Sequence, residues 1–343
     1  MIKVIPVEEA VGTQLAHDVT EIRPGEFKGP AFRKGHTVCD EDVCRLQKLG
    51  KNRLYVIELE EDEIHEDEAA AILAGALAGR NIRWENAPRE GKINLVAAAD
   101  GLLRVRVDTL AAFNMMDEVM CATLHNHTLV KEGDRVAATR AIPLVMKRAA
   151  VERAAAVARS QGPVVEVLPV RAARGGLVVT GNEVYHGLIQ DRFAPIIEDK
   201  LTQLGSELLS VEYVPDDARR IARAVAKALE KGCDLVLLTG GMSVDPDDVT
   251  RAGIRAAGAV DFCYGSAVLP GAMFLSARIG DVPVLGVPAC ALHHRVTVLD
   301  LVLPRILAGE RVGRKELALL GHGGLCRDCA RCTYPHCPFG KGS

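Results

Sequence analysis

Apolar segments of strand length alternate with amphipathic segments of helical length between residues 174 and 257. The predicted strands span 176–180, 208–214 and 234–239, and the predicted helices span 190–205, 218–231 and 249–257. Strands that are joined through helices form parallel sheets with both faces covered. The pattern therefore predicts a three-layer α/β/α domain with a mostly parallel sheet over residues 174–312.

The rest of the chain follows other patterns. A predicted helix at 40–49 and a strand at 53–58 indicate an α+β segment at the start. Eight of the eleven residues 58–68 are acidic, which is typical of a solvated linker or of a helix start. The predicted parts are an α+β segment at 1–60, an acidic linker and helix at 61–91, a small β-rich domain at 92–145, a connecting helix and linker at 146–173, and a Cys-rich tail at 313–343.

Charge and hydropathy limit the partners. The formal net charge is -3 at pH 7, whereas nucleic acids and anionic membranes attract a basic face, so neither is expected. No uncharged apolar run reaches the ~18 residues that span a bilayer. The first residues lack the apolar core of a signal peptide. These features predict a cytoplasmic protein.

Glycines and polar residues gather after the predicted strands, where parallel α/β sheets bind ligands. Glycines let a ligand approach the backbone, hydroxyls and free amides hold phosphate, and acids hold Mg²⁺ or polar ring nitrogens. Singly, an Asp before a helix is typical of a cap, and Gly-Gly after a strand is typical of a turn. Together they predict a site for a phosphorylated heterocycle. The candidates are Thr180, Gly181, Asn182, Glu183, Asp191, Asp216, Thr239, Gly240, Gly241, Ser243 and Asp248.

The order of these motifs resembles the molybdenum-cofactor biosynthesis domain shared by molybdopterin adenylyltransferase, molybdopterin molybdotransferase and the two ends of gephyrin. The likeness rests on Thr180-Gly181-Asn182-Glu183, on Gly187, Ile189 and Asp191, on Pro215-Asp216-Asp217, and on Thr239-Gly240-Gly241 with Ser243, Asp248 and Thr250. The resemblance implies that molybdopterin binds over the glycine loops and the Pro270-Gly271 turn. It implies that Asp216 and Asp248 are catalytic and hold Mg²⁺. It also implies a homodimer, with molybdate and a recipient molybdoenzyme as further partners.

The chain departs from the molybdotransferase pattern at a loop that carries two lysines in that family. Here residues 269–273 read Leu-Pro-Gly-Ala-Met, so both lysines are absent. Preorganised positive charge holds an oxyanion such as molybdate, so the departure weakens the prediction of metal insertion. Two functions therefore remain open: a molybdotransferase-like enzyme that inserts metal into molybdopterin or its adenylylated form, and a non-catalytic carrier, insertion chaperone or sensor. Cys290 with His293 and His294 is a candidate soft-metal site, and the alternative is a buried structural cysteine beside two surface histidines.

Four of the ten cysteines lie in the last eighteen residues of the chain, and they are Cys326, Cys329, Cys332 and Cys337. Their C-x2-C-x2-C-x4-C spacing resembles a ferredoxin run with one extra residue before the last cysteine. A zinc ribbon separates its cysteine pairs by a longer loop. The spacing therefore predicts an iron–sulfur cluster, with structural zinc as the alternative.

Overall fold

The computed structural model describes residues 2–23, 26–57, 59–84, 88, 90–242 and 249–342. The chain forms two compact units. Unit one comprises Met1–Ala98, Val105–Leu124 and Gly133–Glu166, and unit two comprises Ala99–Arg104, His125–Glu132 and Val167–Ser343. None of the described helices combines the length and the apolar character that crossing a bilayer demands.

Unit one begins with a small α+β fold. Strand β1 (Ile2–Pro6) pairs with β4 (Arg53–Ile57), β2 (Val19–Arg23) forms a hairpin with β3 (Phe27–Phe32), and η1 (Val7–Glu9) and α1 (Asp40–Lys48) complete it. Val7, Leu46 and Leu54 belong to its core. The predicted helix and strand are confirmed. Gly50 follows α1 at φ +76°, the left-handed conformation that glycine adopts after a helix.

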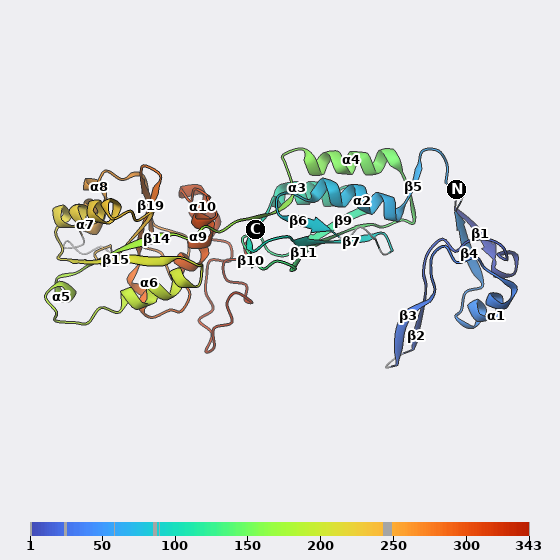
Figure 1. Cartoon of the computed structure of the whole chain (residues 1–343), viewed down its shortest axis with the longest axis horizontal. Coiled ribbons are helices and arrows are strands. Elements are labelled where there is room, and N and C mark those ends of the chain that lie inside the picture. Colours follow the sequence, from blue (N-terminus) through green and yellow to red (C-terminus); the bar gives the residue numbers. More distant parts are fainter. Residues whose placement is uncertain are drawn as a thin grey trace. The chain divides into compact units, whose positions relative to one another are not determined.

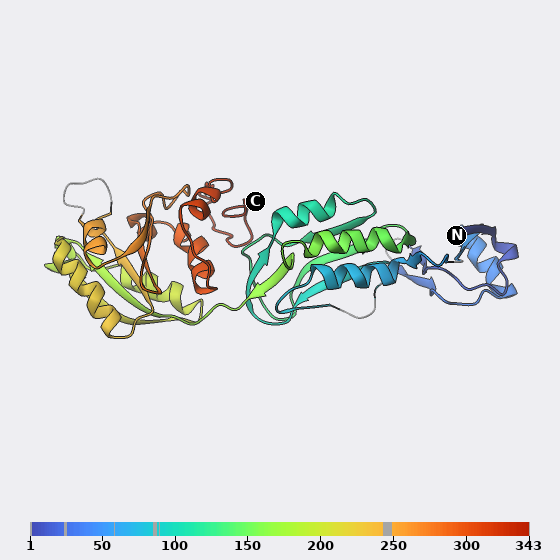
Figure 2. The same ribbon diagram turned by 90° about the horizontal axis from the view of Figure 1, so that it is seen from above.

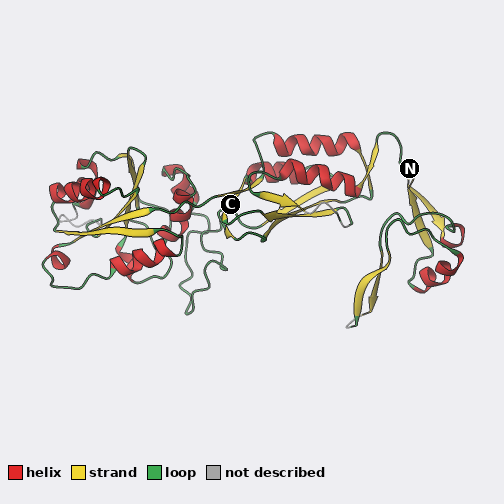
Figure 3. Ribbon diagram, viewed as in Figure 1, coloured by secondary structure: helices red, strands yellow, loops and turns green. Residues whose placement is uncertain are grey.

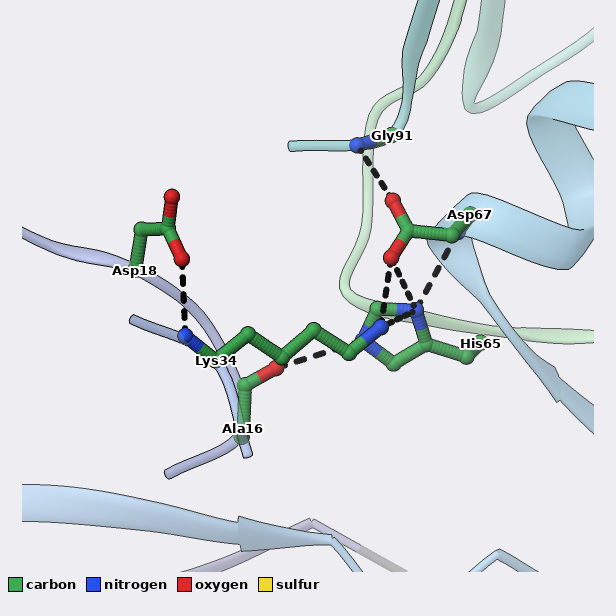
Figure 4. A network of polar contacts seen from close by, with 6 residues as sticks. All are labelled: Ala16, Asp18, Lys34, His65, Asp67 and Gly91. Carbon is green, nitrogen blue, oxygen red and sulfur yellow. Dashed lines mark hydrogen bonds and ion pairs between the residues drawn. The ribbon is translucent and has the colours of Figure 1, made fainter. Parts of the chain in front are cut away.

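A polar network ties the loop after β3 to the start of α2 (Glu66–Leu77). The Lys34 ammonium donates to the Asp67 carboxylate and lies 3.0 Å from His65 Nδ1 (Figure 4). The backbone amide of Gly91 donates to the other Asp67 oxygen at 3.2 Å. Glu66, Asp67 and Glu68 form the first turn of α2, where negative charge is stabilised by the helix dipole. The acidic run is thus partly a helix start.

The rest of unit one is an antiparallel sheet with helices over one face (Figures 1 and 2). The sheet order is β6-β7-β11-β9, from β6 (Ile82–Trp84), β7 (Lys92–Ala97), β9 (Val119–Thr123) and β11 (Arg135–Ala141). Helix α4 (Arg148–Arg159) lies between α2 and α3 (Val107–Asn114) (Figure 2), and β5 (Glu63–His65) pairs with β12 (Val145–Lys147). A further small sheet joins β8 (Gly101–Val105), β10 (Leu129–Val130) and β13 (Val165–Leu168), and most of its residues belong to unit two. The predicted β-rich region therefore also holds a helix, α3, which the pattern does not predict, and its buried residues are Thr109 and Phe113, four positions apart.

Unit two contains a six-stranded sheet of order β15-β14-β16-β19-β18-β17. The strands are β14 (Arg174–Thr180), β15 (Glu207–Val214), β16 (Leu235–Thr239), β17 (Val260–Tyr264), β18 (Leu275–Ile279) and β19 (Val282–Val287). Strands β15, β14, β16 and β19 run parallel to one another, and β18 pairs antiparallel with both β19 and β17. The mixed α/β fold with a mostly parallel sheet is confirmed. The antiparallel edge has no counterpart in the predicted pattern.

Helices cover both faces of this sheet. Helices α6 (Phe193–Thr202) and α9 (Val298–Leu307) lie on one face, and α7 (Ala218–Glu230) and α8 (Thr250–Ala256) lie on the other (Figure 1). Strand alternation sends Leu235 and Leu237 toward α6 and α9, and Val236 and Leu238 toward α7 and α8. Because β14 leads to α6 and β16 leads to α8 on the opposite face, the carboxyl ends of these neighbouring strands form the crevice in which such sheets bind ligands.

Three short elements and a long loop complete unit two. The elements are α5 (Asn182–Tyr185), η2 (Ala289–Leu292) and α10 (Arg314–Leu319). From Leu320 onward the described chain has neither helix nor strand (Figure 3). This tail packs on the α9 side of the sheet, because Phe339 is buried in the same core as α9.

Candidate functional site

The loops after β14 and β16 meet through buried hydroxyls and a glycine. The Thr180 hydroxyl donates to Thr239 O at 3.0 Å and lies 2.9 Å from the Thr250 hydroxyl. A Cβ on Gly240 would stand 2.3 Å from Thr180 O, and φ at Gly240 is +85°. Only glycine combines this conformation with so close an approach. The two strand ends are therefore held together as one edge.

The loop after β15 reaches the same edge. Asn182 N donates to Asp216 Oδ2 at 3.0 Å, and Asp216 N donates to Asn182 Oδ1 at 3.3 Å. A Cβ on Gly241 would lie 2.5 Å from Thr250 Oγ1 and 3.5 Å from Asp216 Oδ1. The predicted loops near 180, 216 and 240 thus converge. The binding and catalytic roles of their residues stay predictions.

A cavity of about 640 Å³ opens beside the two glycines. Gly240 and Gly241 line it after β16, Pro270 and Gly271 line it from the turn before β18, and residues 288–290 line it after β19. Its volume falls in the range of roughly 300–1,000 Å³ that is typical of small-molecule sites. None of the described residues that line it is Lys or Arg, in keeping with the two absent lysines.

Asp191 occupies a different position. Its carboxylate accepts from Phe193 N at 2.7 Å and from Ala194 N at 3.1 Å, so it caps the start of α6. It lines a separate depression of about 500 Å³ and accepts from the Tyr213 hydroxyl at 3.2 Å. Burial raises the pKa of Tyr213, which keeps that hydroxyl a donor. Whether Asp191 also orients a pterin stays a prediction.

Other predicted residues frame the edge. Thr239 is fully buried at the end of β16, and its hydroxyl oxygen has no hydrogen-bond partner within the described ranges. An unsatisfied buried hydroxyl costs about 1–3 kcal/mol. Such a group calls for an explanation, such as a catalytic role or a bound water or ion. Glu183 is exposed, and its carboxylate lies 3.5 Å from where a Cβ on Gly181 would stand. The predictions for Ser243 and Asp248 fall outside the described residues.

The cavity also takes in residues that the sequence motifs do not connect with it. Cys290 and His294 line it, and so do Leu325, Cys326 and Asp328 from the tail. Burial raises the pKa of the Cys290 thiol. The soft-metal site and the structural cysteine both stay predictions. The tail residues lie more than 50 positions from Pro270 in the sequence, so no local pattern indicates their place.

All four tail cysteines line a second cavity, of about 420 Å³, with His293 and His336. Cys326, Cys332 and Cys337 are partly buried and pack against the core around α9, while Cys329 is exposed. In the part of the chain that the structure describes, no three His, Cys, Asp or Glu side chains are arranged around a single metal ion. The four cysteines line the cavity without forming such a group.

The fold and this edge define a class of protein. Residues 176–308 match the family model described as "Probable molybdopterin binding domain", so this part of the chain belongs to the molybdopterin-binding domain family. Residues 4–58 match a family described only as a domain of unknown function.

Curated proteins with a similar segment include CinA-like proteins. The chain is 35% identical over 111 residues to a CinA-like protein of Mycobacterium sp. (strain MCS), covering 32% of this chain and 25% of that protein. It is 39% identical over 79 residues to a CinA-like protein of Mycobacterium tuberculosis (strain ATCC 25177 / H37Ra), covering 23% and 18%. The chain thus spans a quarter or less of these relatives.

Solved structures with a similar segment include CinA of unknown function from Thermoplasma acidophilum (21% identity, TM-score 0.36, 39% of this chain and 98% of that one). They also include the molybdopterin biosynthesis Mog protein from Mycobacterium ulcerans (22%, 0.35, 40% and 99%). A third is the tungsten cofactor synthesizing protein MoaB from Pyrococcus furiosus (19%, 0.32, 41% and 99%).

Proposed function

We propose that this chain is a molybdopterin-binding protein of molybdenum-cofactor biosynthesis that inserts metal into bound molybdopterin or its adenylylated form, as a molybdotransferase does. The observation that carries the proposal is the convergence of the loops near 180, 216 and 240 beside the 640 Å³ cavity. The backbone of Gly240 and Gly241, which lines the cavity, would take the pterin.

Asp216 fits a Mg²⁺ ligand in this scheme. One of its oxygens accepts from Asn182 N, while the other faces Gly241, next to where the phosphate would lie. Carboxylate oxygen is the donor that Mg²⁺ prefers, and the ion would neutralise charge on the reacting phosphate. Asp248 is proposed as the second acid on the family motif. Molybdate as substrate, a recipient molybdoenzyme and a homodimer belong to the same proposal. An iron–sulfur cluster or zinc at the tail cysteines is a separate proposal that does not depend on it.

One observation favours a second function. The described lining of the cavity holds no Lys or Arg, and a site that stabilises a molybdate oxyanion gains most from fixed positive charge. The alternative is a non-catalytic carrier, insertion chaperone or sensor that binds molybdopterin without turnover.

The test uses the full-length protein with molybdopterin, molybdate and Mg-ATP, and measures metal-loaded cofactor by its ability to activate a cofactor-free molybdoenzyme. We expect turnover in the wild type, and loss of turnover with retained pterin binding in Asp216→Asn. Asp217→Asn is the matched control, because Asp217 is the adjacent carboxylate and caps α7 through Arg220 N, a role that Asn keeps. Stoichiometric binding without turnover overturns the enzyme in favour of the carrier. A wild type that does not bind molybdopterin overturns both.

A further inference from the structure

The C-terminal tail, taken here as residues 320–342, contacts the rest of unit two at several points along its length. Leu269 N donates to Gly324 O and Cys326 N donates to Leu269 O, both at 2.8 Å. Farther along, Phe339 is buried with α9, and a Cβ on Gly340 would stand 2.3 Å from the Leu301 side chain. The tail is therefore a docked segment whose shape depends on tertiary contacts, since it has no helix or strand of its own (Figure 3).

The two cavities of this face share a wall. Leu325, Cys326, Asp328 and His294 line both the cavity beside the glycine loops and the cavity of the four cysteines. The backbone hydrogen bond from Cys326 N holds Leu269, the residue directly before the Pro270-Gly271 turn. A ligand that holds Cys326 in place from the cavity of the four cysteines therefore also holds the shared wall of the cavity beside the glycine loops.

We infer that the four tail cysteines hold an iron–sulfur cluster in the cavity that they line. We further infer that the bound cluster positions the wall shared with the cavity beside the glycine loops, called here the pterin cavity, and so determines the affinity of that cavity for molybdopterin. The second half of this inference rests on the proposed function.

The chemistry of the tail cavity suits such a cluster. In a [4Fe–4S] cluster each of four thiolates binds a different iron, so the ligands are spread around the cluster, and all four tail cysteines line this one cavity. Each thiol loses a proton on binding, and the cluster with four thiolates carries negative charge. Arg295 and Arg327 line the same cavity, where their positive charge would offset the negative charge of the bound cluster.

The experiment compares three full-length proteins purified without oxygen and reconstituted with ferrous iron and sulfide: the wild type, Cys332→Ser/Cys337→Ser and Cys39→Ser/Cys44→Ser. Cys332 and Cys337 line the tail cavity and not the pterin cavity, and Cys39 and Cys44 are exposed cysteines of unit one. The readouts are iron and acid-labile sulfide per chain, the thiolate-to-iron absorption band, and the Kd for molybdopterin. As a check that does not depend on folding of a variant, wild-type protein is stripped with a chelator and then reconstituted.

We expect iron, sulfide and the absorption band in the wild type and in the Cys39/Cys44 variant. We expect none of these in the Cys332/Cys337 variant, with at least tenfold weaker molybdopterin binding. Stripping should weaken binding of the wild type to the same degree, and reconstitution should restore it. Zinc alone, or no metal, overturns the cluster, and unchanged affinity after cluster loss overturns the coupling. A loaded wild type that does not bind molybdopterin instead overturns the proposed function and leaves the cluster standing.

Discussion

Replacement of Gly240 by alanine tests whether the close approach of the strand ends is a structural requirement. The residue has φ +85°, and its new Cβ would lie 2.3 Å from Thr180 O and 2.8 Å from Thr180 Oγ1. The left-handed conformation by itself costs an L residue about 1–2 kcal/mol. The contact with Thr180 adds about 1–3 kcal/mol, because the strand ends must move apart. Gly240→Ala is therefore expected to cost about 2–5 kcal/mol.

Gly258→Ala is the matched control. Gly258 follows α8 in the same unit and has nearly the same φ, +87°, but nothing lies within 4 Å of its added Cβ. Its substitution should therefore cost only the conformational ~1–2 kcal/mol. The difference between the two variants isolates the contact with Thr180.

Hydrogen–deuterium exchange of the full-length protein measures both effects locally. Exchange of amides in β14 and β16 reports the free energy of local opening. We expect this free energy to fall further in Gly240→Ala than in Gly258→Ala. Molybdopterin affinity should fall in Gly240→Ala alone, since only that variant displaces the glycine edge. Equal losses of protection in the two variants would refute the reasoning that backbone approach, and not φ, selects Gly240.

Two further substitutions test other parts of the structure. Thr180→Val removes the hydroxyl that donates to Thr239 O and should lower the free energy of local opening of β14 and β16 by about 1–3 kcal/mol. Thr202→Val, at an exposed threonine, is the control and should change this free energy little. Equal effects of the two substitutions would show that the buried hydrogen bond is unimportant. Burial, followed by the charge of Asp67, raises the pKa of Glu66 from 4.5 to about 7. The folded state therefore binds the extra proton between these values, and stability falls as pH rises from about 4.5 through about 7, by about 3 kcal/mol in all. Glu66→Gln should flatten that fall in urea unfolding followed by fluorescence of Trp84, the single tryptophan, which lies in unit one, and an unchanged pH profile would contradict the assigned pKa.

The sequence determined the parts of this protein that depend on near neighbours in the chain. Period-two and helical patterns indicate the parallel strands and helices of unit two, because each element must bury one face whatever its partners are. Local preferences also explain why a glycine, Gly50, follows α1 and why the first turn of α2 is acidic. It also gives the glycines at the ends of β14 and β16, since loops that bind ligands need φ values or approaches that other residues resist.

Only the tertiary structure decided which of these groups come together. Asp191 proves to be a helix cap, because the nearest free amides are those of α6. The antiparallel edge of the sheet depends on pairing partners that no local pattern specifies. The tail reaches the wall of the cavity through backbone bonds between Leu269 and residues 324 and 326. Such long-range pairings follow from packing in three dimensions, which a one-dimensional pattern does not encode.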